Sequence, residues 1–88
     1  MNKKAIIFGV SGQDGSYLAK LLIDKKYSVL GITRNTSPQN LFRLSKLDIL
    51  DKVKLIKGTA IDENFLKKLF KQNNNINEIY YLAGYSSV

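Results

Sequence analysis

Short apolar runs alternate with amphipathic segments along the whole chain. The apolar runs are four to six residues long, contain β-branched or aromatic side chains, and occupy 5–8, 29–33, 53–57 and 78–83. Each run ends at a glycine or a polar residue. Runs of this length and composition are typical of strands that are buried on both faces of a parallel sheet.

Between these runs, apolar side chains recur every three or four residues, which is the spacing of one face of a helix. The three stripes are Tyr17, Leu18, Leu21 and Leu22; Leu41, Leu44 and Leu47; and Phe65, Leu66, Leu69 and Phe70. The second follows Pro38 and predicts only a short helix. Lysines lie on the opposite side of the first and third stripes.

The resulting order of elements is βαβαβαβ. Strict alternation of strands and helices predicts an α/β fold with a parallel sheet and right-handed crossovers. We expect the N-terminal half of a Rossmann-type, doubly wound parallel sheet, with the strands in the spatial order 3-2-1-4. An all-helical protein or a β-sandwich would not explain the buried runs.

A glycine-rich turn joins the first strand to the first helix. Its glycines are Gly9, Gly12 and Gly15, in the spacing G-x-x-G-x-x-G. Gly9 suits a tight turn, Gly12 allows the backbone to approach a pyrophosphate, and Gly15 allows close packing of the helix. The pattern predicts a dinucleotide whose phosphates lie at the helix N-terminus. The alternative is a structural turn in which Ser11 or Asp14 caps the helix.

Arg34 indicates which dinucleotide would bind. It lies 19 residues after Gly15, and no Asp or Glu occurs between Lys26 and Lys46. At this place an acidic residue binds the adenosine ribose 2′-hydroxyl of NAD, whereas an arginine suits the 2′-phosphate of NADP. We therefore expect NADP, with further hydrogen bonds from Thr33, Asn35 and Ser37. The alternative is a solvated loop arginine.

Composition narrows the possible functions. The 88 residues carry a net charge of +7, yet only two of the 14 basic residues are arginine. The lysines are spread along the chain without an RNA-binding or zinc-binding signature, so we expect an anionic nucleotide as ligand and no nucleic acid. The sequence has no cysteine and no histidine, and we expect no metal site.

The sequence pattern also does not predict a signal peptide or a membrane span. The opening apolar run is short and is interrupted by Gly9, unlike a signal peptide. No stretch approaches the roughly 18 apolar residues of a membrane span. We expect a cytoplasmic protein without a membrane partner.

Residues 9–18, GVSGQDGSYL, closely resemble the opening of GDP-mannose 4,6-dehydratases, which are extended members of the short-chain dehydrogenase/reductase superfamily. The Gln-Asp pair between the glycines is much more specific to this family than the glycine spacing alone. The resemblance continues through 31–34, GITR, and through 80–88, YYLAGYSSV, which is similar to the family's YNLAAQSHV. It covers nearly the whole chain, but only the first quarter of such an enzyme.

The resemblance implies a set of cofactor-binding residues. The glycine turn would line the pyrophosphate, Arg34 would hold the 2′-phosphate, and residues 59–60 would lie near the adenine. Residues 82–84 would lie along the nicotinamide side, or would alternatively form a buried strand end that needs small residues. Ser86 would touch the ribose or the substrate. The full set is Gly9, Gly12, Gln13, Asp14, Gly15, Arg34, Thr59, Ala60, Leu82, Ala83, Gly84 and Ser86.

The chain also departs from the family pattern. Gly58-Thr59-Ala60 replaces the usual Gly-Asp-Leu, which implies an altered adenine contact. Tyr81, Tyr85 and Ser87 replace the usual asparagine, glutamine and histidine. These differences indicate a divergent member. Sugar-nucleotide epimerases and 4-reductases share most of the features and remain alternatives, as does a small stand-alone nucleotide- or nucleic-acid-binding protein.

By resemblance, the complete enzyme would use NADP to convert GDP-mannose to GDP-4-keto-6-deoxymannose and would be a homo-oligomer. The superfamily's catalytic Tyr-x-x-x-Lys pair does not occur in residues 1–88. We therefore expect no catalytic residue here, but a partial NAD(P)-binding domain that ends before the catalytic and substrate-binding regions and is inactive alone. The strand at 78–83 would be a sheet edge, with Tyr80 and Leu82 poorly covered.

Overall fold

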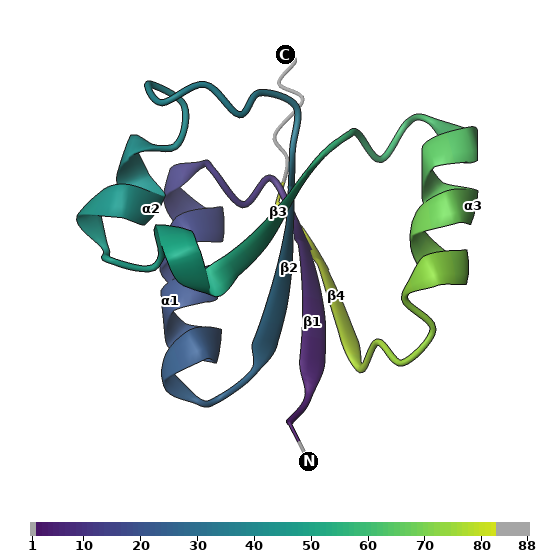
Figure 1. The fold of residues 1–88 in the computed structure, drawn as a ribbon, viewed down its shortest axis with the longest axis horizontal. Coiled ribbons are helices and arrows are strands. Elements are labelled where there is room, and N and C mark those ends of the chain that lie inside the picture. The colour runs from purple at the N-terminus through teal and green to yellow at the C-terminus, as the bar shows by residue number, and fades with distance from the viewer. Residues whose placement is uncertain (1, 83–88) are drawn as a thin grey trace.

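The computed structural model describes residues 2–82 and has the predicted α/β architecture (Figure 1). The strands are β1 (Lys4–Phe8), β2 (Ser28–Thr33), β3 (Val53–Lys57) and β4 (Glu78–Tyr81). The helices are α1 (Gln13–Asp24), α2 (Phe42–Lys46) and α3 (Glu63–Gln72), with a short 3-10 turn at Leu50–Lys52. Among the strands, β3 has the predicted bounds, β1 and β2 each begin one residue earlier, and β4 ends two residues earlier.

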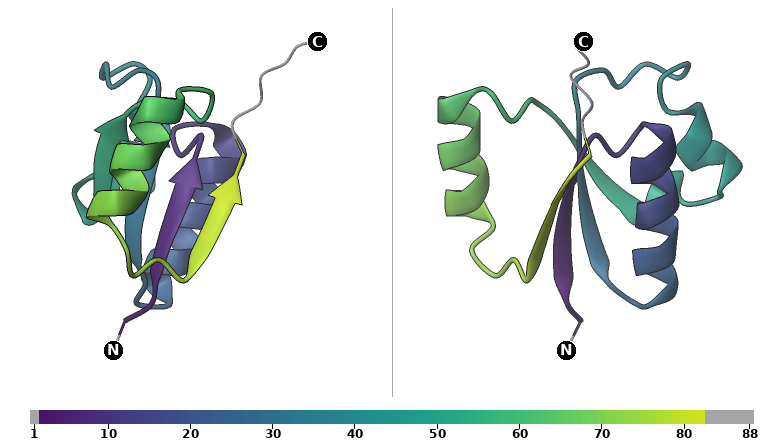
Figure 2. Two further views of the ribbon diagram at one scale, coloured as in Figure 1. Left: turned by 90° about the vertical axis from the view of Figure 1, so that its right-hand side faces the viewer. Right: turned by 180° about the vertical axis from the view of Figure 1, so that it is seen from behind.

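Within residues 2–82 the strands form one parallel sheet in the predicted order β3-β2-β1-β4. The central strand β1 pairs with β2 on one side, with Ile7 opposite Gly31, and with β4 on the other, with Ile7 opposite Tyr80. Because all strands run in the same direction, their carboxyl ends meet at one edge of the sheet. The turns that leave β1, β2 and β3 therefore gather there (Figures 1 and 2).

Helices cover both faces of the sheet (Figure 2). Successive side chains of a strand point to opposite faces. In β1, Ala5 and Ile7 belong to the core under α1 and α2, whereas Ile6 and Phe8 belong to the core under α3. This arrangement explains why the strand needs a continuous apolar run rather than an alternating one.

Helix α1 buries a face of small residues. Gly15, Ser16 and Ala19 are buried against the turn and the sheet, together with the larger Leu22. Tyr17 and Leu21 are 59% and 51% exposed, so the predicted apolar stripe is wrong at these two positions. The small residues let the helix lie close to the backbone, and this rotates its contact face away from the larger side chains.

Strand β4 is the less protected side of the sheet. Ile79 and Tyr81 are 53% and 51% exposed, and Leu82 is 41% exposed. Tyr80 instead packs against the core under α1, and its hydroxyl donates to Glu78 at 2.6 Å. The expected exposure is therefore confirmed for Leu82 and wrong for Tyr80.

No helix in residues 2–82 is long and apolar enough to cross a membrane. The same residues contain no group of three or more acidic side chains placed to hold a metal ion. The cytoplasmic location stays a prediction.

Candidate functional site

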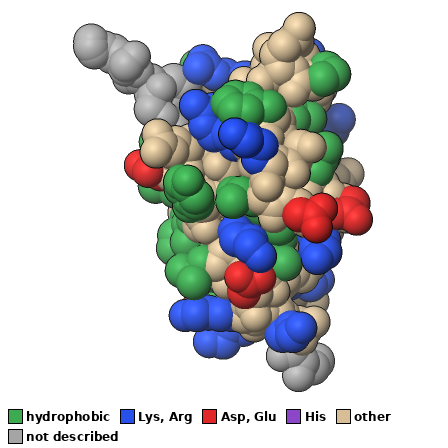
Figure 3. Space-filling model, turned by 90° about the vertical axis from the view of Figure 1, so that its left-hand side faces the viewer, with side chains coloured by type: hydrophobic (Ala, Val, Ile, Leu, Met, Phe, Trp, Pro, Cys, Tyr) green, Lys and Arg blue, Asp and Glu red, His purple; other side chains and the backbone are tan. Residues whose placement is uncertain are grey.

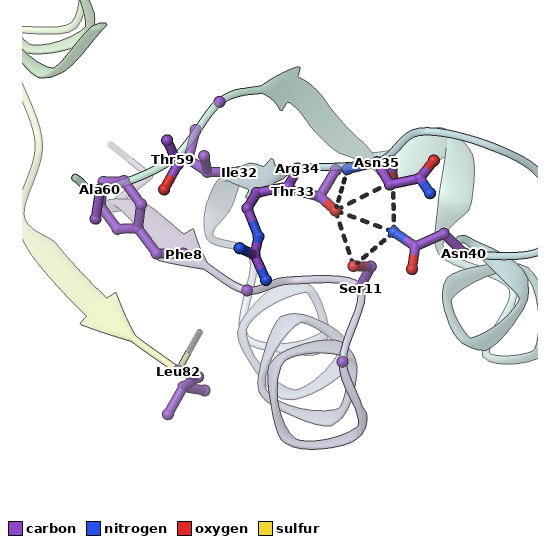
Figure 4. A pocket seen from close by; sticks show the side chains of 13 residues that line it. Phe8, Ser11, Ile32, Thr33, Arg34, Asn35, Asn40, Thr59, Ala60 and Leu82 are labelled. Atoms are coloured by element: carbon purple, nitrogen blue, oxygen red, sulfur yellow. Dashed lines mark hydrogen bonds between the residues drawn. The ribbon is translucent and has the colours of Figure 1, made fainter. Parts of the chain in front are cut away.

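A pocket of about 250 Å³ opens at the carboxyl edge of the sheet, between the glycine turn, the ends of β2 and β3, and the residue after β4 (Figure 4). Six of the predicted cofactor-binding residues line it: Gly9, Gly12, Arg34, Thr59, Ala60 and Leu82. The other lining residues are Phe8, Ser11, Ile32, Thr33, Asn35, Asn40 and Gly58. The carboxyl edge of an open parallel sheet is where such folds bind ligands.

The glycine turn is anchored to β2. Gly9 has a φ of 83°, a conformation that favours glycine. The N–H groups of Gly9 and Val10 both donate to the carbonyl of Ile32, at 2.9 and 3.3 Å. The chain therefore turns sharply at the end of β1 and stays in contact with the neighbouring strand, which places the turn against the pocket.

The protein itself requires glycine at one later position of the turn but not at the other. A Cβ on Gly15 would lie 2.1 Å from the carbonyl oxygen of Gly9 and 2.9 Å from the Cα of Val10. A Cβ on Gly12 would meet only the Gly9 oxygen, at an ordinary 3.5 Å, and the φ of Gly12 is −75°. Packing within the protein thus explains Gly15 and leaves Gly12 without a reason.

Among residues 2–82, no side chain caps the N-terminus of α1. Gly12 is the N-cap residue, and the hydroxyl of Ser16 donates back to its carbonyl at 2.6 Å. The Ser11 hydroxyl lies 2.9 Å from that of Thr33, and Asp14 lies in the first turn. The alternative of a cap by Ser11 or Asp14 is therefore wrong. A 12-residue helix without a side-chain cap keeps a positive N-terminal end beside the glycine turn.

Arg34 follows β2 directly and is the one residue with a charged side chain among the described residues that line the pocket. Its guanidinium extends over the glycine turn (Figure 4). The described lining residues include no Asp or Glu, so the local field favours an anionic ligand.

A hydrogen-bond network lies beside Arg34 (Figure 4). The side-chain amide of Asn40 donates to the hydroxyls of Ser11 and Thr33, at 3.1 and 3.2 Å, and also to the carbonyl of Asn35. The Thr33 hydroxyl donates to the same carbonyl at 3.2 Å. The network joins the glycine turn to the end of β2 and to the loop that follows.

The end of β3 closes the opposite side of the pocket. The N–H of Gly58 donates to the carbonyl of Thr33 at 2.9 Å, and this continues the β2–β3 ladder by one residue. Thr59 and Ala60 then face the pocket, and the Thr59 hydroxyl accepts from the N–H of Ile61 at 3.4 Å. These residues lie across the pocket from the glycine turn (Figure 4).

Other predicted residues lie away from this pocket. Gln13 lines a second hollow of about 440 Å³ between α1 and α2, and Gly15 lies on the buried face of α1. That hollow is larger, but it combines apolar side chains such as Tyr17 and Phe42 with cations and has no glycine turn (the same side of the molecule is seen in Figure 3). Ala83, Gly84 and Ser86 lie outside the described residues.

The sequence interpretation missed several lining residues. Phe8 and Ile32 are near the ends of their strands, so the topology would have placed them at this edge. Asn40 carries no comparable signal, because its partner Ser11 lies 29 residues away and their contact depends on the fold of the loop.

Comparison with known proteins gives the family. The model of the GDP-mannose 4,6-dehydratase family matches residues 6–88. The chain belongs to this family. It is 39% identical over 92 residues to the GDP-mannose 4,6-dehydratase of Cricetulus griseus, which covers 98% of this chain and 24% of that protein. It is also 39% identical over 97 residues to the enzyme of Vibrio cholerae, covering 100% and 25%. The chain thus spans about a quarter of the length of these relatives.

Solved structures confirm the Rossmann-type fold. The Bordetella bronchiseptica enzyme WbmH, in complex with NAD⁺, matches with a TM-score of 0.73 at 22% identity, over 100% of this chain and 27% of that one. The UDP-glucuronic acid 4-epimerase of Bacillus cereus, in complex with UDP-glucuronic acid and NAD, matches with a TM-score of 0.70 at 24% identity, over 97% and 27%. At these identities the likeness shows the fold alone.

Proposed function

We propose that this chain forms the adenosine and pyrophosphate side of an NADP site in a GDP-mannose 4,6-dehydratase. The observation that carries the proposal is the pocket between an open glycine turn and Arg34 in a member of this family. The solved structures of similar fold, WbmH and the epimerase, hold NAD, which supports a nicotinamide dinucleotide. The family match favours a dehydratase over an epimerase, a 4-reductase or a nucleic-acid-binding protein.

The residues present fit this cofactor. Gly12 leaves the space of a Cβ open at the turn, and the uncapped N-terminus of α1 favours the pyrophosphate. Arg34 holds the 2′-phosphate, because a planar guanidinium can donate two parallel hydrogen bonds to it. Thr59 and Ala60 border the adenine, and Leu82 borders the nicotinamide side, which the proposal extends to Ala83, Gly84 and Ser86.

The bound cofactor supplies the redox chemistry, since it accepts a hydride from the sugar and returns it. The part of this chain is to bind and orient that cofactor. Tyr17, Tyr27, Tyr80 and Tyr81 are not followed four positions later by a lysine, and we assign no catalytic residue to residues 1–88. We propose that the GDP-mannose site, the catalytic groups and the homo-oligomer interface belong to the remaining length of the relatives.

The test compares two arginines. Purified protein, Arg34→Ala and Arg43→Ala are titrated calorimetrically with NADP⁺ and with NAD⁺. Arg43 is the matched control, because it lies over the Phe42 ring at 4.7 Å in the second hollow and not in the pocket. Loss of a charge-assisted contact to phosphate should weaken NADP⁺ binding of Arg34→Ala by about tenfold to a hundredfold.

We expect NAD⁺ binding to stay within about twofold in both variants, because NAD⁺ lacks the 2′-phosphate. Unchanged NADP⁺ binding by Arg34→Ala, or an equal loss in Arg43→Ala, would contradict the assignment of the phosphate to Arg34. A folded protein that binds neither dinucleotide would contradict the proposed function as a whole.

A further inference from the structure

The side chain of Asn40 bridges the loop after β2 and the elements beside it. Its amide donates to acceptors on three separate segments: Ser11 in the glycine turn, Thr33 at the end of β2, and the carbonyl of Asn35 in the loop. Asn40 is partly buried, whereas its neighbour Gln39 is exposed. A single amide thus joins the turn assigned to the pyrophosphate to the loop that begins with Arg34.

Residues 34–40 fold back on themselves through local hydrogen bonds. The Asn35 side chain accepts from the N–H of Ser37 at 2.8 Å, and the N–H groups of Asn40 and Leu41 donate to the carbonyl of Ser37 at 3.0 and 3.1 Å. At its start the loop is bonded to the end of β2 through the Thr33 hydroxyl, which donates to the Asn35 carbonyl at 3.2 Å and accepts from the Asn35 N–H at 3.4 Å. The amide of Asn40 attaches the far end of the loop to the same hydroxyl.

The network also constrains the hydroxyl protons. In one consistent arrangement Thr33 donates to the Asn35 carbonyl, Ser11 donates to Thr33, and the two N–H groups of Asn40 are shared among three acceptors. In that arrangement Ser11 and Thr33 have no proton to offer a phosphate. A 2′-phosphate, which is an acceptor, then depends on the guanidinium of Arg34 and on where the loop holds it.

We propose that Asn40 is a positioning residue that sets the preference for a 2′-phosphate by fixing the backbone on both sides of Arg34. This inference rests on the proposed NADP function. Asn40 holds Thr33, which precedes Arg34, and the carbonyl of Asn35, which follows it. A held backbone presents the guanidinium at one place, so less side-chain freedom is lost when the phosphate binds.

A double-mutant cycle tests this role. NADP⁺ and NAD⁺ affinities are measured by calorimetry for the purified protein, Asn40→Ala, Arg34→Ala and the double variant. Asn73→Ala is the matched control, because the Asn73 amide donates to the Leu69 carbonyl at 2.9 Å at the end of α3, a similar bond outside the pocket lining. Asn40→Gln keeps the amide donors on a longer side chain.

We expect Asn40→Ala to weaken NADP⁺ binding by about fivefold, the effect of one net hydrogen bond. NAD⁺ binding should change by less than about twofold, and so should NADP⁺ binding when the same substitution is made in Arg34→Ala, because coupled sites are non-additive. Asn40→Gln should bind NADP⁺ with an affinity between those of the parent and Asn40→Ala. Asn73→Ala should leave both affinities unchanged.

A merely structural role would lower the melting temperature and weaken both dinucleotides equally. That result would overturn the proposal, as would an undiminished effect of Asn40→Ala in the Arg34→Ala background. A parent protein that binds NADP⁺ through Arg34 but ignores Asn40 would overturn this inference alone. A folded parent protein that binds neither dinucleotide would overturn the proposed function, and this inference with it.

Discussion

The glycine turn leaves different amounts of space for a side chain at Gly15 and at Gly12. On the side of Gly15 the protein leaves no room, because a Cβ would lie 2.1 Å from a backbone oxygen. On the side of Gly12, three residues earlier, a Cβ would meet only an ordinary contact at 3.5 Å. Two glycines of one motif are thus required for different reasons. The fold requires Gly15, and we propose that the ligand requires Gly12.

The largest loss of stability is expected for a substitution at Gly15. Gly15→Ala should lower the free energy of unfolding by about 3 kcal/mol or more, because the new methyl meets backbone that cannot move aside cheaply. Urea unfolding followed by circular dichroism measures the loss, with Gly12→Ala as the matched control. A Gly15→Ala protein as stable as its parent would mean that α1 does not lie as close to the turn as the structure shows.

A substitution at Gly12 should instead affect dinucleotide binding more than stability. Gly12→Ala should cost about 1 kcal/mol of stability or less, the difference between glycine and alanine as N-cap residues. It should weaken NADP⁺ and NAD⁺ alike by about tenfold or more, because both share the pyrophosphate that the methyl would displace. Calorimetric titration of both dinucleotides measures this, and selective loss of NADP⁺ alone would contradict the placement of the pyrophosphate at Gly12.

The fold could be predicted because each buried run is short, apolar and followed by an amphipathic segment. The order β3-β2-β1-β4 and the bounds of β3 follow from that alternation. The contact face of α1 could not be predicted in the same way. The helical spacing of large apolar residues predicted that Tyr17 and Leu21 would be buried. The close approach of the helix buries Ser16 and Ala19 instead, and such small residues give only a weak signal in the sequence.

The site was predictable where one residue type has a specific task. Gly9 and Arg34 line the pocket because a turn and a strand end place them there. Asn40 could not be predicted, since it acts on partners from three segments that only the folded loop brings together. The position of Gln13 in the second hollow likewise depends on where α2 packs.

The smallest effect on stability is expected at the opposite edge of the sheet, where a cluster of polar side chains lies away from the pocket. The Glu78 carboxylate accepts from the hydroxyls of Tyr27 and Tyr80, at 2.7 and 2.6 Å. The hydrogen bond from Tyr80, followed by that from Tyr27, lowers the pKa of Glu78. The hydrogen bond to Glu78 raises the pKa of Tyr27 and of Tyr80.

The sign of the pH dependence follows from these directions. The lowered pKa of Glu78 gives stability above the ordinary value of 4.5, which is lost as the pH falls through the folded-state pKa. The raised tyrosine pKa values give stability below 10.0, which is lost as the pH rises through them. Thermal melts of Glu78→Gln should therefore show a flatter dependence on pH at both ends, with NADP⁺ affinity unchanged. A parallel fall in NADP⁺ affinity would mean that the two edges are not independent.

A residue-resolved NMR titration of ¹⁵N-labelled protein with NADP⁺ shows whether the carboxyl-edge pocket binds the dinucleotide. We expect saturable shifts of the amide signals of Gly9, Gly12, Arg34, Asn40 and Thr59, and little change at Glu78 on the opposite edge. Shifts confined to the hollow at Tyr17 and Phe42, or unmoved pocket signals at high NADP⁺ concentration in a folded protein, would contradict binding at this pocket.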